Sequence, residues 1–185
     1  MSCLFRKLIL VGFLMIMWLQ SVGAPAEVVD AAAGGFAVKN SIEISATPQR
    51  VYDAIVSQTG SWWNSTHTFS GNSKNLSIDA TPGGCFCERW DGKAGVRHMT
   101  VVYADPGKRL RLSGSLGPLQ DTGVTGSMTF SLVQADGKTK LDLIYNVGEY
   151  SPNGLNRLAP VVDSVLLEQI TRLKRFVETG IPDPK

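Results

Sequence analysis

The sequence contains few cysteines, little net charge and no apolar run long enough to span a membrane. Its 185 residues include three cysteines, and 18 Lys and Arg stand against 16 Asp and Glu, for a formal net charge of +2. Arg6 and Lys7 account for the surplus, so the rest of the chain has no broad positive field and we expect no nucleic-acid partner. Phosphate-loop, Gly-x-Ser-x-Gly and His-Glu-x-x-His motifs are also missing, so none of these common active sites is indicated.

The first 26 residues have the pattern of a secretory signal. Arg6 and Lys7 precede the uncharged run 8–19, and Ala24-Pro25-Ala26 has small residues at the spacing of a cleavage site. A spanning helix needs about 20 apolar residues, so this run is short for a stable anchor. We expect cleavage after Ala26 and a periplasmic or secreted body with no stable membrane span. The alternative is that the segment is retained as an uncleaved anchor.

The rest of the chain is expected to form one domain over residues 36–180, between a flexible lead-in (27–35) and a short tail (181–185). Thr47 and Pro48 have the residue types of a helix N-cap and first turn, before apolar residues at helical spacing. Apolar residues also recur every three or four positions from 155 to 177, which predicts a helix of about twenty residues that ends at Gly180. Alternating or β-rich segments bounded by turn residues predict strands near 36–46, 76–80, 85–90, 96–104, 109–116, 128–132 and 141–147.

This order of elements favours a ligand cavity. A sheet of six or seven antiparallel strands twists strongly, so its apolar face becomes concave. A single long amphipathic helix can cover that concave face without filling it. We therefore expect an apolar space between the sheet and the terminal helix.

Three segments carry a resemblance to a known group. Residues 42–48 with 51–55, the run Thr81-Pro-Gly-Gly-Cys-Phe-Cys-Glu-Arg-Trp90, and the terminal helix resemble the SRPBCC superfamily, across residues 36–180. That group includes START-related lipid carriers, polyketide cyclases and homologues of the activator of the heat-shock ATPase. The resemblance implies an α+β helix-grip fold, in which a curved antiparallel sheet of six to seven strands wraps around a long C-terminal helix.

Glu88 and His98 are the candidate catalytic residues. Phe86, Glu88 and Trp90 share one face of a strand, and the large apolar pair favours that face as the inner one. Burial would then raise the pKa of Glu88 toward that of a useful acid or base, with His98 on a nearby strand as its partner. If the other face is inward, Glu88 is solvated, and His98 is an ordinary hydrogen-bonded histidine.

Cys85 and Cys87 lie on the same side of one strand. A bond between them would close a tight ring, so two small buried thiols are favoured over a disulfide. Export would still allow the thiols to oxidise, so the sequence leaves their redox state open. Zinc binding with His67 or His98 is an alternative, but this spacing is not that of the usual structural sites, and we expect no metal.

The function that this pattern favours is non-catalytic binding of a hydrophobic molecule, such as a lipid-, isoprenoid- or polyketide-like ligand, with no cofactor. One alternative is a cyclase or dehydratase that uses Glu88 and His98, with Tyr145 or Tyr150 holding a carbonyl oxygen; another is a protein-binding regulatory module. Trp62 and Trp63 either line the cavity mouth or plug one end of the core. The residues expected to contact the ligand are Trp62, Trp63, Phe69, Phe86, Glu88, Trp90, His98, Leu112, Met128, Phe130, Leu143, Tyr145, Leu158, Val162, Val165 and Leu166.

Overall fold

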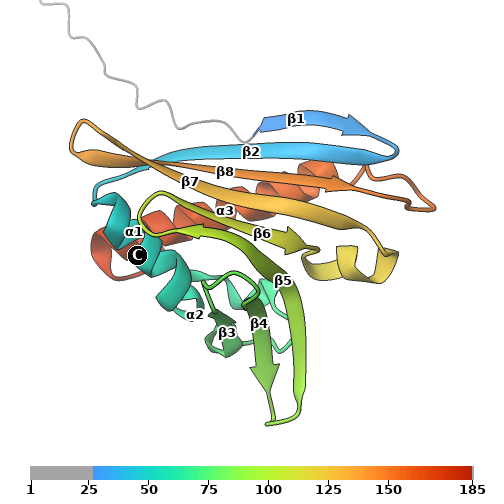
Figure 1. The fold of residues 1–185 in the computed structure, drawn as a ribbon, viewed down its shortest axis with the longest axis horizontal. Helices are drawn as coiled ribbons and strands as arrows, with labels where there is room; N and C mark the ends of the chain where they lie inside the picture. Colours follow the sequence, from blue (N-terminus) through green and yellow to red (C-terminus); the bar gives the residue numbers. More distant parts are fainter. Residues whose placement is uncertain (1–26, 185) are drawn as a thin grey trace, which may run out of the picture.

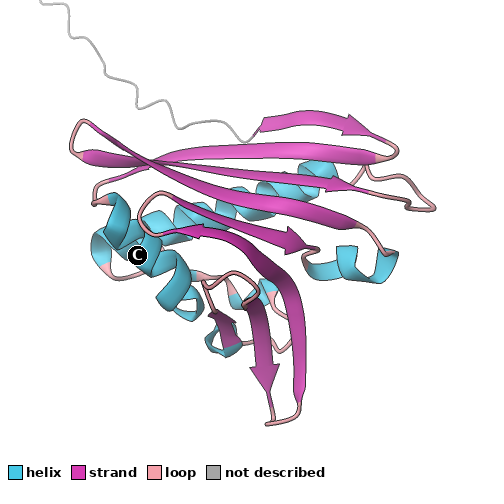
Figure 2. Ribbon diagram, in the orientation of Figure 1, coloured by secondary structure: helices cyan, strands magenta, loops and turns pink. Residues whose placement is uncertain are grey.

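Eight antiparallel strands form one sheet in residues 27–184, the part of the chain that the computed structural model describes (Figures 1 and 2). The predicted signal segment, residues 1–26, lies outside the described residues. The strand order is β1-β2-β8-β7-β6-β5-β4-β3, so most neighbours in the sheet are also neighbours in sequence. The strands are β1 (Glu27–Ala32), β2 (Gly35–Ile44), β3 (Leu76–Ile78), β4 (Cys85–Trp90), β5 (Ala94–Asp105), β6 (Arg109–Gly114), β7 (Thr125–Ala135) and β8 (Lys138–Gly148).

Capping residues mark the start of the first helix and the end of the last one. Helix α1 (Pro48–Ser57) starts with Pro48 in its first turn, and the Thr47 hydroxyl accepts a hydrogen bond from the Arg50 N–H. Helix α3 (Ala159–Thr179) ends at Gly180, which has a left-handed backbone and donates its N–H to the Phe176 carbonyl. The shorter helices are α2 (Thr59–Trp62) and the 3-10 helices η1 (Ser65–His67), η2 (Ser73–Asn75) and η3 (Gly117–Thr122).

The expected helix-grip fold is confirmed, with one strand more than the six or seven predicted. The extra strand is β1, so the description of residues 27–35 as a flexible lead-in is wrong. Backbone pairing with β2, from Glu27 opposite Lys39 to Ala32 opposite Gly35, forms this strand. All its side chains are exposed, so no alternation of apolar and polar residues could mark it in the sequence.

Register shifts bend the far half of the sheet. The β4–β5 ladder shifts between Phe86 and Cys87, and the β5–β6 ladder shifts between Val101 and Tyr103. Such bulges kink a strand and increase its twist. In Figure 1, β4 and β5 turn away from the plane of β2, β8 and β7, so the sheet curves around one end of α3.

The middle of the grip is solidly packed. The inward rows of β6, β7 and β8 belong to one buried cluster with Leu166, Ile170 and Leu173 of α3. The strand residues in these rows are at most 5% exposed; they are Leu110, Leu112, Met128, Phe130, Leu132, Leu141, Leu143 and Tyr145. No helix of residues 27–184 is long and apolar enough to cross a membrane.

Replacing Leu143 by Ala should lower the free energy of unfolding by about 2–5 kcal/mol, because the side chain is 1% exposed at the centre of β8 and its loss leaves a cavity. Urea unfolding followed by circular dichroism measures this. Val133→Ala is the matched control, because Val133 is 59% exposed on β7 and its truncation should change stability by less than about 0.5 kcal/mol. Equal losses in the two variants would contradict the packing described.

Candidate functional site

A cavity of about 440 Å³ lies where the bent end of the sheet separates from the N-terminal half of α3. Its walls come from the segment 63–69, from β3, β4 and β5, from the start of η3, and from the first turns of α3. The lining residues are Trp63, Thr66, His67, Thr68, Phe69, Leu76, Phe86, His98, Leu116, Gly117, Pro118, Leu119, Leu158, Val161, Val162, Val165 and Leu166.

Half of the residues expected to contact a ligand line this cavity. They are Trp63, Phe69, Phe86, His98, Leu158, Val162, Val165 and Leu166. The other eight do not line the cavity: most of them are packed within the core, and Glu88 lies behind His98. These eight are Trp62, Glu88, Trp90, Leu112, Met128, Phe130, Leu143 and Tyr145.

The mouth of the cavity has an apolar rim formed by Phe69, Leu158 and Val161. These side chains are 51%, 36% and 62% exposed. The sequence analysis did not include Val161 among the ligand contacts, because Val161 lies outside the buried apolar face of α3. Leu116 and Leu119 were missed because residues 109–116 were expected to be one strand, whereas β6 ends at Gly114 and η3 follows. Pro118 in the first turn of η3 was the available signal.

The two adjacent tryptophans have different roles. Trp62 is 1% exposed and donates its indole N–H to the Ala54 carbonyl, so it plugs the core beside α1. Trp63 lines the cavity, but its N–H donates to the His67 carbonyl. Both N–H groups are therefore committed to backbone, and Trp63 presents apolar surface to the cavity.

A bulge places His98 at the cavity wall. Phe86 pairs with Met99 and Cys87 pairs with Arg97, so His98 is the extra residue of β5 in this ladder. His98 and Met99 are consecutive and both buried, which a regular strand with one side chain up and the next down would not allow. The imidazole lies near the rings of Phe69 and Phe86, with centroid separations of 5.9 and 5.0 Å.

Glu88 lies behind His98 and is fully buried. Its Oε2 atom is 3.2 Å from His98 Nε2 and accepts the Phe69 N–H at 3.0 Å, and its Oε1 atom accepts the Ser70 N–H at 2.5 Å. The carboxylate therefore joins the sheet to the segment that forms one wall of the cavity. The structure brings Glu88 and His98 together, but Glu88 does not line the cavity.

The expectation of a raised pKa for Glu88 is wrong. Burial opposes ionisation, but the hydrogen bonds from Ser70, Phe69 and His98 outweigh it and hold the pKa of Glu88 below its ordinary value. Burial also lowers the pKa of His98, although the neighbouring Glu88 acts to raise it. Near neutral pH the pair is therefore a carboxylate beside a neutral imidazole, with the Nε2–H donating to Glu88.

The two tyrosines considered for a carbonyl oxygen are not at the cavity. Tyr145 is fully buried in β8 and donates its hydroxyl to the Gly114 carbonyl at 3.2 Å. Its burial raises the pKa of Tyr145 to about 12, so it stays protonated. Tyr150 is 80% exposed, and the cavity lining does not include it.

A second carboxylate holds the start of the segment 63–69. Glu168 of α3 accepts a hydrogen bond from the Asn64 side chain, and its Oε2 atom is 3.1 Å from His67 Nε2. Together with Glu88, it ties this wall of the cavity to both the helix and the sheet. Sequence reasoning had no signal for this contact, because the two segments are about a hundred residues apart.

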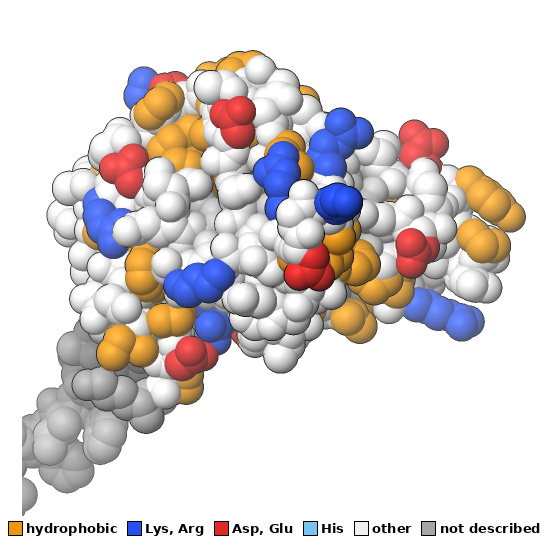
Figure 3. All heavy atoms as spheres, turned by 90° about the horizontal axis from the view of Figure 1, so that it is seen from below, with side chains coloured by type: hydrophobic (Ala, Val, Ile, Leu, Met, Phe, Trp, Pro, Cys, Tyr) orange, Lys and Arg blue, Asp and Glu red, His pale blue; other side chains and the backbone are white. Residues whose placement is uncertain are grey.

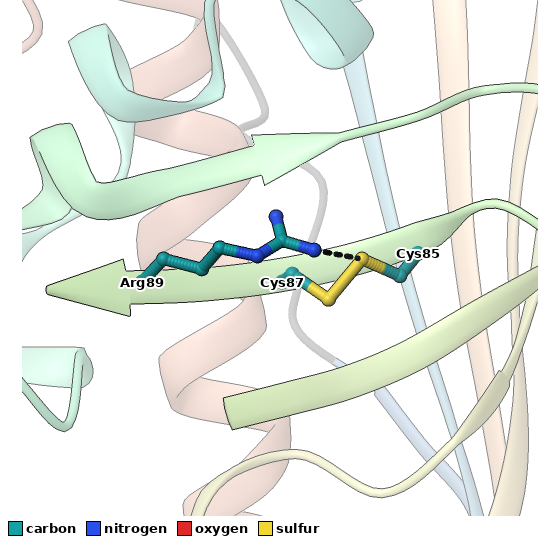
Figure 4. Close-up of a disulfide and its surroundings, with 3 residues drawn as sticks. All are labelled: Cys85, Cys87 and Arg89. Atoms are coloured by element: carbon teal, nitrogen blue, oxygen red, sulfur yellow. Dashed lines mark hydrogen bonds between the residues drawn. A yellow bond between two sulfur atoms is a disulfide. The ribbon is translucent and has the colours of Figure 1, made fainter. Parts of the chain in front are cut away.

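Cys85 and Cys87 form a disulfide, and Arg89 Nη2 lies 3.5 Å from Cys85 Sγ (Figure 4). The expectation of two separate thiols is wrong, and so is the alternative of a zinc site that uses them. The two Cα atoms are 5.4 Å apart, close to the commonest separation in disulfides, whereas a regular strand would hold them about 6.6 Å apart, near the upper limit of the usual range. The ladder to β5 shifts register between Phe86 and Cys87, so the disulfide lies beside the bulge at His98.

Residues 27–184 contain no group of three or more His, Cys, Asp or Glu side chains placed to hold a metal ion. Seen from below, hydrophobic side chains form separate groups between Lys, Arg, Asp and Glu (Figure 3). That face therefore has no large patch of one charge.

Comparison with known proteins supports this description of the fold. The model of the family described as "Activator of Hsp90 ATPase homolog 1-like protein" matches residues 45–178. No curated protein matches the chain.

Three solved structures are similar in fold. A conserved protein of unknown function from Enterococcus faecalis has a TM-score of 0.58 and 18% identity, over 86% of this chain and 80% of that one. DynU16, from the dynemicin biosynthetic locus, has a TM-score of 0.57 and 18% identity over 79% of this chain, which spans 48% of DynU16. CalU16 from Micromonospora echinospora has a TM-score of 0.56 and 14% identity, over 85% of this chain and 86% of that one.

Acid should destabilise the protein through Glu88 and His98. Both have a lower pKa in the folded state, so the unfolded state binds more protons as the pH falls. The contribution of His98 to the free energy of unfolding is lost as the pH falls below its ordinary pKa of 6.5. The contribution of Glu88 is lost below its ordinary pKa of 4.5. Urea unfolding at pH 7, 5.5 and 4 should show a progressive fall in the free energy of unfolding.

Glu88→Gln should cost about 1–3 kcal/mol at pH 7, because an amide replaces a charged acceptor of three hydrogen bonds, and it should flatten the change between pH 5.5 and 4. Glu43→Gln is the control, because the Glu43 side chain is 66% exposed. A Glu88→Gln protein as stable and as acid-sensitive as the wild type would show that this carboxylate does not hold the site together.

Proposed function

We propose that this chain, which belongs to the Activator of Hsp90 ATPase homolog 1-like protein family within the SRPBCC superfamily, binds an apolar small molecule in the cavity at the start of α3. One observation carries the proposal: a space of about 440 Å³ is enclosed mainly by aromatic and aliphatic side chains. That volume lies in the range of about 300–1,000 Å³ that is usual for small-molecule sites. Of the histidine and threonine side chains that line the cavity in the described part of the chain, that of His98 is buried.

The energetics favour ligands larger than a short chain. Each buried methylene contributes about 0.8 kcal/mol, so ten contribute about 8, against an association cost of about 4–15 kcal/mol. A mid-length acyl or isoprenoid chain would bind modestly. A molecule with fused rings, such as a polyketide-like compound, loses less conformational entropy and would bind more tightly for the same buried area.

A carrier or sensor is a better match to the site than a cyclase with Glu88 as its acid. An acid catalyst must be protonated and must reach the substrate. Glu88 has a lowered pKa, does not line the cavity and spends both oxygens on hydrogen bonds within the protein. We therefore propose that Glu88 positions His98 and the segment 63–69 rather than transferring a proton to a ligand.

The exposed rim favours a second candidate, in which an apolar segment of another protein docks over the mouth. Phe69 and Val161 are more than half exposed and lie beside the opening. Filling the cavity interior would abolish small-molecule binding while leaving this rim intact, so the two candidates can be separated by one substitution.

Val162→Trp should weaken binding of the fluorescent probe N-phenyl-1-naphthylamine by at least about tenfold, because an indole on α3 would occupy the cavity. Fluorescence titration measures this, and native mass spectrometry of gently purified wild-type protein should show a bound small molecule. Val102→Trp is the control, because Val102 is 49% exposed on β5 and outside the cavity. Wild-type protein that takes up no probe and carries no molecule would refute the proposal.

We also propose that the chain is exported and cleaved after Ala26. The basic start, the short apolar run and the Ala24-Pro25-Ala26 ending support this, as does a disulfide, which persists mainly in oxidising compartments. Expression of the full chain in a bacterial host should yield a protein outside the cytoplasm whose intact mass corresponds to a start at Glu27.

Ala26→Phe should block that processing, because the cleavage site needs a small residue. Ser21→Ala, a small-for-small change before the site, is the control. A wild-type product that keeps Met1 and stays in the membrane would support the uncleaved anchor instead.

A further inference from the structure

The chain has two histidines, and both line the cavity, but in different surroundings. His67 is exposed at the mouth and pairs with Glu168. His98 is 6% exposed and lies deep in the wall, where the surrounding cavity surface is almost entirely apolar. A buried polar atom beside an apolar space is costly unless a hydrogen-bond partner satisfies it.

The contacts of His98 fix which of its nitrogens is available. Nε2 faces the Glu88 carboxylate at 3.2 Å, and an ionised carboxylate only accepts hydrogen bonds, so Nε2 carries the hydrogen. The ring of Phe69 is stacked on the imidazole and that of Phe86 is tilted against it, so the ring is held in this orientation. In a neutral imidazole with hydrogen on Nε2, Nδ1 is a hydrogen-bond acceptor.

That acceptor is poorly used within the described protein. Gln120 Nε2 approaches Nδ1 at 3.4 Å, which is longer than an ordinary N–H donor contact. The same amide group donates to the Ser115 carbonyl at 3.0 Å, which holds Gln120 in place. The single lone pair of Nδ1 is therefore engaged only by this long contact, which a stronger donor can replace.

We infer that the cavity selects apolar molecules that carry a hydroxyl group, an alcohol or a phenol, and that this hydroxyl donates a hydrogen bond to His98 Nδ1. The inference rests on the proposed function and specifies the ligand's chemistry. A molecule with an ether or carbonyl oxygen in the same place would set an acceptor against an acceptor, which removes the gain and adds a desolvation cost. Glu88 is then a positioning residue, because it selects the tautomer that exposes an acceptor.

The test compares two probes of one skeleton, 2-naphthol and 2-methoxynaphthalene, by displacement of N-phenyl-1-naphthylamine from the full chain. The ratio of the two dissociation constants reports the hydroxyl preference. His98→Phe should reduce that preference about fivefold, the size of one net hydrogen bond, while both probes still bind. Tyr150→Phe is the control and should leave the ratio unchanged, because it removes a hydroxyl group that is exposed and outside the cavity.

A second measurement keeps the inference testable if His98→Phe does not fold. In the wild-type protein, nitrogen NMR of labelled imidazoles should show hydrogen on Nε2 of His98, and 2-naphthol should shift the Nδ1 resonance in the direction of an accepted hydrogen bond. The methyl ether should not cause this shift.

The outcomes separate the two proposals. Binding of both probes with the same ratio in wild type and His98→Phe, or a naphthol complex in which Nδ1 does not shift, would overturn the hydroxyl inference and leave the cavity's function standing. Failure of both probes and of the dye to bind the wild type would overturn the proposed function together with the inference.

Discussion

The buried carboxylate of Glu88 is the interaction on which the cavity depends. It accepts hydrogen bonds from the backbone N–H groups of Phe69 and Ser70, at the end of the segment 63–69, and from His98 on β5. A charge with no exposure survives in a protein only when such donors replace its water. Because the donors come from two separate elements, satisfying this charge also sets the distance between the sheet and the segment that closes one side of the cavity.

The position of the cavity follows from the bulges in β5. Where the ladders are regular, through β2, β8, β7 and β6, the apolar rows of the strands form one buried cluster with α3. Beyond the register shifts the strands turn away, while β2 still contacts the helix start through the hydrogen bond from Asn40 Nδ2 to Asp163 Oδ1 at 2.9 Å. The space is bounded by β3, β4 and β5 together with η3 and the segment 63–69.

Much of the architecture could be predicted from the sequence, because the helix caps and the apolar periodicity in the sequence match the helix ends and the buried faces of the structure. Thr47 and Pro48 began a helix, Gly180 ended one, and alternating rows such as Leu141, Leu143 and Tyr145 marked buried strands. Strand β1 escaped prediction because all its side chains are exposed, so pairing with β2 alone defines it. The disulfide escaped because strand geometry was assumed to be regular at Cys85 and Cys87, where the ladder shifts.

The sequence by itself determined the fold class and the apolar faces, because these follow from residue type and period; the pairing of a carboxyl with a histidine was one of the two arrangements that it left open. The tertiary structure alone decided which apolar residues line the cavity and which pack against one another, since this depends on where α3 and the sheet separate. It also decided the charge state of Glu88, because the hydrogen-bond donors that lower its pKa lie on a segment whose position only folding establishes.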